Sequence, residues 1–217
     1  MSRNEPDEAR APFAFLADLH GNLLALDAVL QELRDRDVGS IFVAGDLLFP
    51  GPDPVGVWKR LQEVGARCVR GSSDLALARV EPGSLRPASE AEGARLERFR
   101  ATREALGDLV LARLRRLPQA LRLTLPGPVE LTVLHGSPTD PYTDLNASDS
   151  DEELEALLGP DPGDVVVCGG SHTPFLRQVG DVQVVGLGSV GEAPEGRVAH
   201  FTLLGLGGVF EHLWVPW

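Results

Sequence analysis

Acidic residues and histidines recur in five short motifs, each directly after an apolar run that is typical of a strand. Carboxylate oxygens and imidazole nitrogens on loops at strand ends are usual ligands of divalent metal ions in α/β proteins. The sequence therefore indicates metal-dependent chemistry. In chain order, the motifs are Asp18-Leu-His20-Gly-Asn22, Gly45-Asp46, Gly71-Ser-Ser-Asp74, His135-Gly136 and Gly169-Gly-Ser-His172-Thr-Pro174.

Each motif taken alone also has a simpler interpretation. Asp18 and His20 lie two residues apart, so in an extended segment both side chains project to the same side and can reach one cation. Alternatively, Asp18 or Asn22 caps the helix that follows. Five such motifs in this order favour one shared site. The remaining motifs also have simpler interpretations. Gly45-Asp46 is a common turn pair, and His135 and His172 could be ordinary histidines at strand ends.

The first third of the chain alternates apolar strands with amphipathic helices. Between the strands, Asn22 precedes one helix and Asp53-Pro54 opens the next, which is a typical pairing of a cap with proline at the first helical position. This alternation predicts a largely parallel sheet that is covered on both faces. The expected strands span 13–17, 41–44 and 67–70.

The remainder of the chain has a different pattern. Helical spacing of apolar residues predicts one or two helices within 81–117. A turn signal at Pro126-Gly127-Pro128 predicts a hairpin whose second strand leads to His135. A short acidic helix at 151–158 and a strand at 165–168 follow, and the C-terminal third is expected to be mostly antiparallel.

The composition limits the classes of function. At 217 residues and 43% hydrophobic, the chain is long enough for one sizeable core, so we expect a tail at 1–12 and a single domain at 13–217. The formal charge of -12 opposes both a role in coating nucleic acids and binding to anionic membranes. No apolar run is long enough to span a membrane, and the polar first residues lack a secretory signal, so we expect a cytoplasmic protein.

These motifs resemble those of the calcineurin-like metallophosphoesterases, and specifically the small bacterial and archaeal phosphodiesterases. The family's order is Asp-x-His, Gly-Asp, Gly-Asn-x-Asp, His-Gly and Gly-His-x-His. The likeness covers about residues 13–204 and implies an α/β four-layer sandwich, in which two stacked mixed β-sheets are flanked by helices. Beyond the ligand positions, it extends to three segments: residues 45–54, residues 135–138 and Gly188-Ser189-Val190.

The resemblance implies a two-metal centre at the strand ends. The first ion would be bound by Asp18, His20, Asp46 and His172, all present, with Asp46 bridging to the second ion. Two of the four ligand positions of the second ion are changed, since serine stands in place of asparagine and glycine in place of histidine. A third departure is serine where many relatives have a histidine that protonates the leaving group. These three changed positions are Ser72, Gly170 and Ser73.

The resemblance implies a hydrolase with one well-bound divalent ion (manganese, iron, zinc or nickel) and an impaired second site. Its expected activity is hydrolysis of phosphodiesters or phosphomonoesters by a metal-activated hydroxide, with a small phosphorylated molecule as substrate. Asn22 and His135 are the expected catalytic and substrate-binding residues, and His135 is also a ligand of the second ion. The alternative is a weakly active or inactive binding or regulatory module, as in a eukaryotic retromer subunit with this fold. The sequence specifies no oligomeric state.

Overall fold

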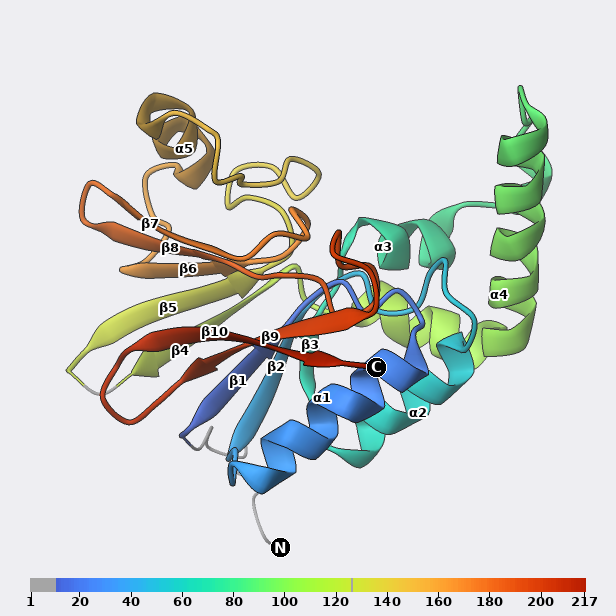
Figure 1. Ribbon diagram of the computed structural model, residues 1–217. Coiled ribbons are helices and arrows are strands. Elements are labelled where there is room, and N and C mark those ends of the chain that lie inside the picture. Colours follow the sequence, from blue (N-terminus) through green and yellow to red (C-terminus); the bar gives the residue numbers. More distant parts are fainter. Residues whose placement is uncertain (1–10, 126) are drawn as a thin grey trace, which may run out of the picture.

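The computed structural model of the protein describes residues 11–125 and 127–217, so most of the expected tail, residues 1–10, lies outside the described residues. The strands form two five-stranded sheets that stack on each other (Figure 1). The first sheet has the order β10 (Phe210–Pro216), β9 (Val198–Leu204), β1 (Phe13–Leu16), β2 (Ser40–Ala44) and β3 (Arg67–Val69). The second has the order β4 (Ala120–Leu125), β5 (Val129–Leu134), β6 (Val165–Cys168), β8 (Val182–Gly186) and β7 (Phe175–Val179).

Both sheets are mixed. In the first, β1, β2 and β3 are parallel, as the alternation of strands and helices predicts, whereas β9 and β10 are antiparallel. In the second, β5, β6 and β8 are parallel, and the outer strands β4 and β7 pair with them in the antiparallel sense. The predicted hairpin is β4 and β5. Parallel strands carry their C-terminal ends to the same edge, which brings their following loops together.

The helices lie on the outer faces of the sheets. Asn22 caps α1 (Leu23–Asp35) by accepting from Ala25 N–H, and Asp53 caps α2 (Pro54–Glu63). In the predicted helical region, the positive φ of Gly107 interrupts α4 (Glu90–Arg116), so it consists of two helical segments. Within 11–125 and 127–217, no helix is both long and apolar enough to cross a membrane. The remaining helices are α3 (Ser72–Arg79), the 3-10 turn η1 (Pro82–Ser84) and α5 (Asp151–Leu158).

The core explains why the sheets stack. Along β1, Phe13 and Phe15 face the second sheet, whereas Ala14 and Leu16 face the helices, because successive side chains of a strand point to opposite sides. A further apolar cluster joins α5 to the second sheet. The four layers of helix, sheet, sheet and helix confirm the expected sandwich.

Candidate metal centre

The loops after β1, β2, β5 and β6 carry the motif residues to one place. Backbone hydrogen bonds fix their paths, because Asp18 N–H donates to Gly45 O at 3.1 Å and His20 N–H donates to Asp46 O at 2.9 Å. The loop after β8 joins the same network, since Gly191 N–H donates to Asp18 O at 2.9 Å. Three segments that are distant in sequence are thus bonded to one another around the motif side chains.

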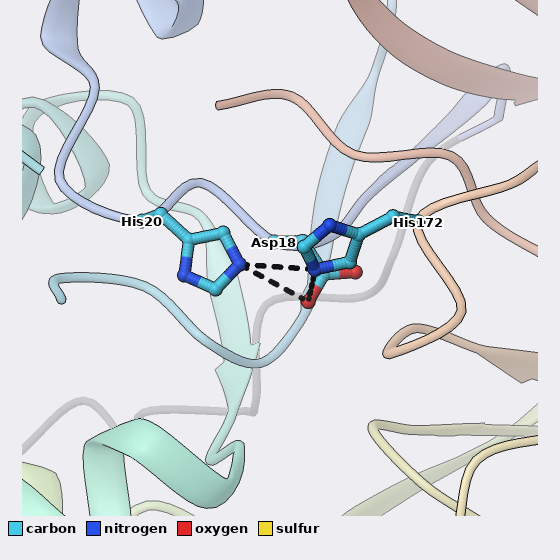
Figure 2. Close-up of side chains that lie close together, drawn as sticks. All are labelled: Asp18, His20 and His172. Atoms are coloured by element: carbon cyan, nitrogen blue, oxygen red, sulfur yellow. Dashed lines mark hydrogen bonds and ion pairs between the residues drawn. The ribbon is translucent and has the colours of Figure 1, made fainter. Parts of the chain in front are cut away.

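One group of ligand atoms is formed by Asp18, His20 and His172 (Figure 2). The two Nε2 atoms of His20 and His172 lie 3.1 Å apart. Asp18 Oδ1 lies 3.6 Å from Nε2 of His172 and 3.9 Å from Nε2 of His20. Three lone-pair atoms from two loops therefore face one small volume, as the predicted first metal site requires.

A second group is formed by Asp18, Asp46 and His135, all buried. His135 Nε2 lies 3.4 Å from Asp46 Oδ1, and His135 Nδ1 lies 3.9 Å from Asp18 Oδ1. The structure thus brings together all five predicted ligands. It also places Asp18 in both groups, a shared position that the resemblance implies for Asp46.

Backbone carbonyls orient the three histidine rings. The Nδ1 atoms of His20, His135 and His172 lie 2.6, 2.8 and 3.2 Å from the carbonyl oxygens of Phe49, Ala44 and Glu192, respectively. A carbonyl oxygen only accepts hydrogen bonds, so each Nδ1 carries the hydrogen. In the neutral ring, Nε2 is then the free lone-pair atom and faces the carboxylates. This arrangement is typical of metal-binding histidines.

The surroundings of the Asp18 carboxylate show whether the site suits a cation. Its side chain is fully buried and Oδ2 accepts from Gly170 N–H at 3.0 Å, but Oδ1 has no hydrogen-bond partner within the described residues. A buried carboxylate oxygen without a partner is costly, because its hydration is lost and not replaced. A divalent cation between Oδ1 and the nearby Nε2 atoms would remove this cost, so the residues fit a metal ion.

The acids and histidines also shift each other's pKa. Burial alone would raise the pKa of Asp18, but the close approach of His172, with Nε2 at 3.6 Å, and the charges of the three histidines outweigh it and hold that pKa below its usual range. The same close approach of the Asp18 carboxylate raises the pKa of His172 to about 9 despite desolvation. Burial would lower the pKa of His135, but the charges of Asp46 and Asp18 raise it. The carboxylates thus favour the protonated forms of His135 and His172.

The backbone at the ligands is strained. Among the described residues, five that are not glycine have a positive φ, and four of these are Asp18, His20, Asp46 and His172. The left-handed conformation is disfavoured for residues with a Cβ and persists where surrounding contacts impose it, often at functional sites. These four residues are the full set that the family resemblance assigns to the first metal ion.

Asn22 is buried and uses both ends of its amide within the fold. Its Oδ1 accepts from Ala25 N–H at 3.2 Å, and its Nδ2 donates to Gly191 O at 3.1 Å. The helix-capping interpretation is therefore confirmed. A contact between Asn22 and a substrate phosphate stays a prediction, and it requires Nδ2 to exchange the Gly191 carbonyl for the phosphate.

The third motif supports Asp46. Ser72 Oγ lies 3.4 Å from Asp46 Oδ2 and donates to it, and Ser73 N–H donates to Asp46 Oδ1 at 2.9 Å. Asp74 accepts from Gly71 N–H and Leu47 N–H at 2.9 and 3.0 Å, which joins this loop to the loop after β2. Burial and the charge of Asp46 raise the pKa of Asp74 to about 7. Asp74 thus holds the loops together.

Two acidic residues at the centre lie outside the motifs. Glu192 Oε2 is 3.7 Å from His20 Nε2. Asp144, half-buried in the loop between β5 and α5, lies against Gly170. Burial raises the pKa of Asp144, and the charges of His135, Asp18 and Asp46 also act on it. Neither residue follows a strand directly, so the pattern that identified the other ligands gave no signal for them.

Among the described residues, several cavities open beside the centre, and two of them are lined by arginines that could contact a substrate. One, of about 560 Å³, is lined by Arg98 and Glu192 together with the loop after β2. The other, of about 220 Å³, lies beside Ser72 and is lined by Arg70 and Arg79. Guanidinium groups are well suited to phosphate oxygens, because they present several donors in one plane.

Comparisons with known proteins agree with this fold. A hypothetical protein from Pyrococcus horikoshii OT3 has a structure that aligns with a TM-score of 0.82 and 23% identity, over 95% of this chain and 88% of that chain. The structure of a metallophosphoesterase from Sphaerobacter thermophilus aligns with a TM-score of 0.72 and 21% identity, over 93% of this chain and 87% of that chain. An uncharacterized protein of Methanocaldococcus jannaschii is 31% identical over 65 residues, which are 30% of this chain and 27% of that protein's length. Residues 12–207 match the calcineurin-like phosphoesterase superfamily domain, and the chain therefore belongs to this superfamily.

Proposed function

We propose that the protein is a metal-dependent phosphoesterase that hydrolyses a small phosphomonoester or phosphodiester. The observation that carries the proposal is the buried Oδ1 of Asp18, which has no hydrogen-bond partner among the described residues and faces the Nε2 atoms of His20 and His172. Asp18, His20, Asp46 and His172 would hold the first ion. Mixed nitrogen and oxygen donors suit manganese, iron, zinc or nickel.

The second ion is the weaker one in this proposal. Asp46 and His135 are available to it, but Ser72 offers a neutral hydroxyl that is already bonded to Asp46, and Gly170 offers no side chain. The activity is therefore expected to be lower than that of a chain with the full ligand set. The resemblance and the chemistry of these side chains support this part of the proposal.

Each group at the centre has a definite task in the reaction. When bound, a divalent cation lowers the pKa of a coordinated water and withdraws charge from phosphoryl oxygens. Asp18 and Asp46 hold negative charge in a buried setting. Where no second ion is bound, the protonated ring of His135 can donate from Nε2 to a phosphoryl oxygen. Arg70 and Arg79 line the adjacent cavity, where they would bind a phosphate group of the substrate.

The test is hydrolysis of p-nitrophenyl phosphate and bis-p-nitrophenyl phosphate with manganese supplied. We expect turnover by the purified chain and its loss in Asp46→Asn, because the amide removes the charge that holds the cation. The ratio of the two rates gives the preference for monoesters or diesters. Equal rates for the chain and the variant would contradict the proposal.

Replacement of two ligand positions favours a second candidate function, a binding or regulatory module with little or no activity. Ser72 and Gly170 carry this alternative. A Vps29 from Chaetomium thermophilum shares the fold at 17% identity and a TM-score of 0.54. The same assay distinguishes the candidates, since a binding module that retains its first metal site would bind manganese without turnover.

We also infer that residues 13–217 act as one domain in the cytoplasm. The two sheets share the apolar cluster that lies between them. Cys68 and Cys168 are both free and buried, which is common in a reducing compartment. Limited proteolysis that released a stable fragment from within 13–217 would contradict the single domain.

A further inference from the structure

Gly170 leaves space for the carboxylate of Asp144. A Cβ built on Gly170 would lie 2.5 Å from Cγ and 3.2 Å from Oδ2 of Asp144, and closer still to Oδ1. No side chain at position 170 fits beside this carboxylate without displacing it. The first atoms of the histidine side chain that relatives carry here would therefore coincide with the Asp144 carboxylate.

The loop that carries Asp144 is anchored. Leu145, the next residue, is fully buried in the cluster beneath α5. Asn146 Nδ2 donates to the backbone oxygen of Asp144 at 3.3 Å, and Asn146 N–H donates to Asp149 Oδ2 at 2.8 Å. These contacts fix the backbone of Asp144 and leave its side chain to face Gly170.

Within residues 11–125 and 127–217, the carboxylate of Asp144 has no hydrogen-bond partner. In the part of the chain that the structure describes, no donor bonds to it and no arginine or lysine pairs with it. The ionisable groups that act on it are those of the metal centre: His135, Asp18, Asp46 and His172. A half-buried carboxylate beside two other carboxylates gains most from a nearby cation, because the cation offsets both burial and repulsion.

We propose that Asp144 is a ligand of the second metal ion and supplies, from the loop after β5, the donor that Gly170 lacks. The inference rests on the proposed metal-dependent function. Asp18, Asp46 and Asp144 together carry three negative charges, and one divalent cation leaves this set with a net negative charge. A second divalent cation would more than offset this remaining charge. Exchanging a nitrogen donor for a carboxylate oxygen also favours harder ions such as manganese over zinc at this position.

Gly170 and Asp144 are coupled in this arrangement. The φ of Gly170 is +83°, and its N–H donates to Asp18 Oδ2, so its position relative to the first site is fixed. A methyl group at 170 would push the Asp144 carboxylate away from the centre. Gly170→Ala and Asp144→Ala should therefore weaken the same ion, and the double variant should lose no more than either single variant.

The experiment is titration of the metal-free chain with manganese, with stoichiometry measured by calorimetry and by elemental analysis. We expect two ions of unequal affinity for the unchanged chain. In Asp144→Ala, the second ion should bind about tenfold more weakly or be lost, while the affinity for the first ion is retained. The matched control is Asp181→Ala, which removes an exposed aspartate in the turn between β7 and β8.

The melting temperature without metal shows whether each variant is folded. If Asp144→Ala is destabilised, Asp144→Asn keeps the shape and removes only the charge, and it should also weaken the second ion. Equal stoichiometry and affinities in the unchanged chain and the Asp144 variants would overturn this inference and leave the proposed function intact. A chain that binds no manganese at all would overturn the proposed function, and this inference with it.

Discussion

Asp18 belongs to both groups of ligand atoms. It is fully buried, it lies within 4 Å of nitrogens from three histidines, and one of its oxygens is unpartnered within the described residues. The charge of Asp18 also holds the pKa of His172 high. A single carboxylate thus lies next to all three histidines, and its unpartnered oxygen favours a bound cation.

Removing one ligand should remove the stabilisation that metal gives. At a manganese concentration about 100 times the dissociation constant, binding adds about 2.7 kcal/mol to the free energy of unfolding. We expect this increment in the unchanged chain and little of it in Asp46→Asn or His172→Ala. Thermal unfolding with and without manganese measures it.

The control for this measurement is Asp37→Asn. Asp37 also has a positive φ but lies exposed and outside the metal centre, so its variant should keep the full increment. An equal metal-dependent rise in melting temperature for the ligand variants would show that manganese binds elsewhere.

The raised pKa of His172 predicts how pH affects the metal-free protein. The folded-state pKa is about 9, above the ordinary value of 6.5, so the folded state holds this proton more tightly than the unfolded state. The resulting stabilisation is complete below about pH 6.5 and is lost as the pH rises through about 9. Metal-free protein should therefore melt at a lower temperature at pH 9.5 than at pH 6.5.

Metal should reverse this trend. Binding requires a neutral imidazole, so manganese competes with the proton on His172 and its affinity should rise over the same pH range. Melting curves across pH, with a chelator or with manganese, give both slopes. His172→Gln should flatten the metal-free slope. A slope unchanged in this variant would assign the effect to other groups.

At the scale of elements, the N-terminus of α3 positions the carboxylate of Asp46. Gly71 directly precedes this helix, and a Cβ built on Gly71 would lie 2.8 Å from Cγ of Asp46. The strand end and the helix start approach so closely that only glycine fits. Ser72 and Ser73 then donate to Asp46 from the first turn.

Gly71→Ala should therefore displace Asp46. The φ of Gly71 is -96°, which alanine adopts without strain, so the cost is steric. We expect a loss of about 1–3 kcal/mol in stability and weaker manganese binding. Gly83→Ala is the control, because no atom lies within 4 Å of a Cβ at that position. Urea unfolding and metal titration of both variants measure the effects, and similar results for the two would contradict the steric argument.

At the scale of the whole molecule, the apolar cluster between the two sheets links the position of the candidate metal ligands to the folding of both sheets. Phe15 is fully buried there, stacks on Phe42 at a centroid distance of 5.4 Å and contacts Phe210 at 6.0 Å. Asp18 follows on the same segment. The position of the ligand loop is thus set by how the two sheets pack.

Phe15→Ala should destabilise the whole chain by about 3–5 kcal/mol, because it opens a cavity between the sheets. Leu109→Ala removes an apolar side chain that is 69% exposed and should change stability by less than about 0.5 kcal/mol. Urea unfolding followed by fluorescence and by circular dichroism measures both. Unfolding of one sheet before the other would contradict a shared core.

Much of the fold and of the ligand set follows from local sequence patterns. The periodicity of apolar residues indicates the strands and helices, and the caps at Asn22 and Asp53 mark where helices begin. The order of the motifs indicates the family, and with it the four layers. Strands, helices and helix caps depend on residues that are neighbours in the chain, so local sequence patterns indicate them directly.

Contacts between distant loops were decided by the tertiary structure alone. That Asp18 belongs to both groups of ligand atoms, and that Asp144 fills the space beside Gly170, depends on where two loops meet after the sheets have packed. Local sequence patterns identify the residues that could bind a metal ion and the strands that precede them. Which of these side chains lie in one group follows from the packed fold, because loop paths are set by backbone contacts across the sheets and not by local periodicity.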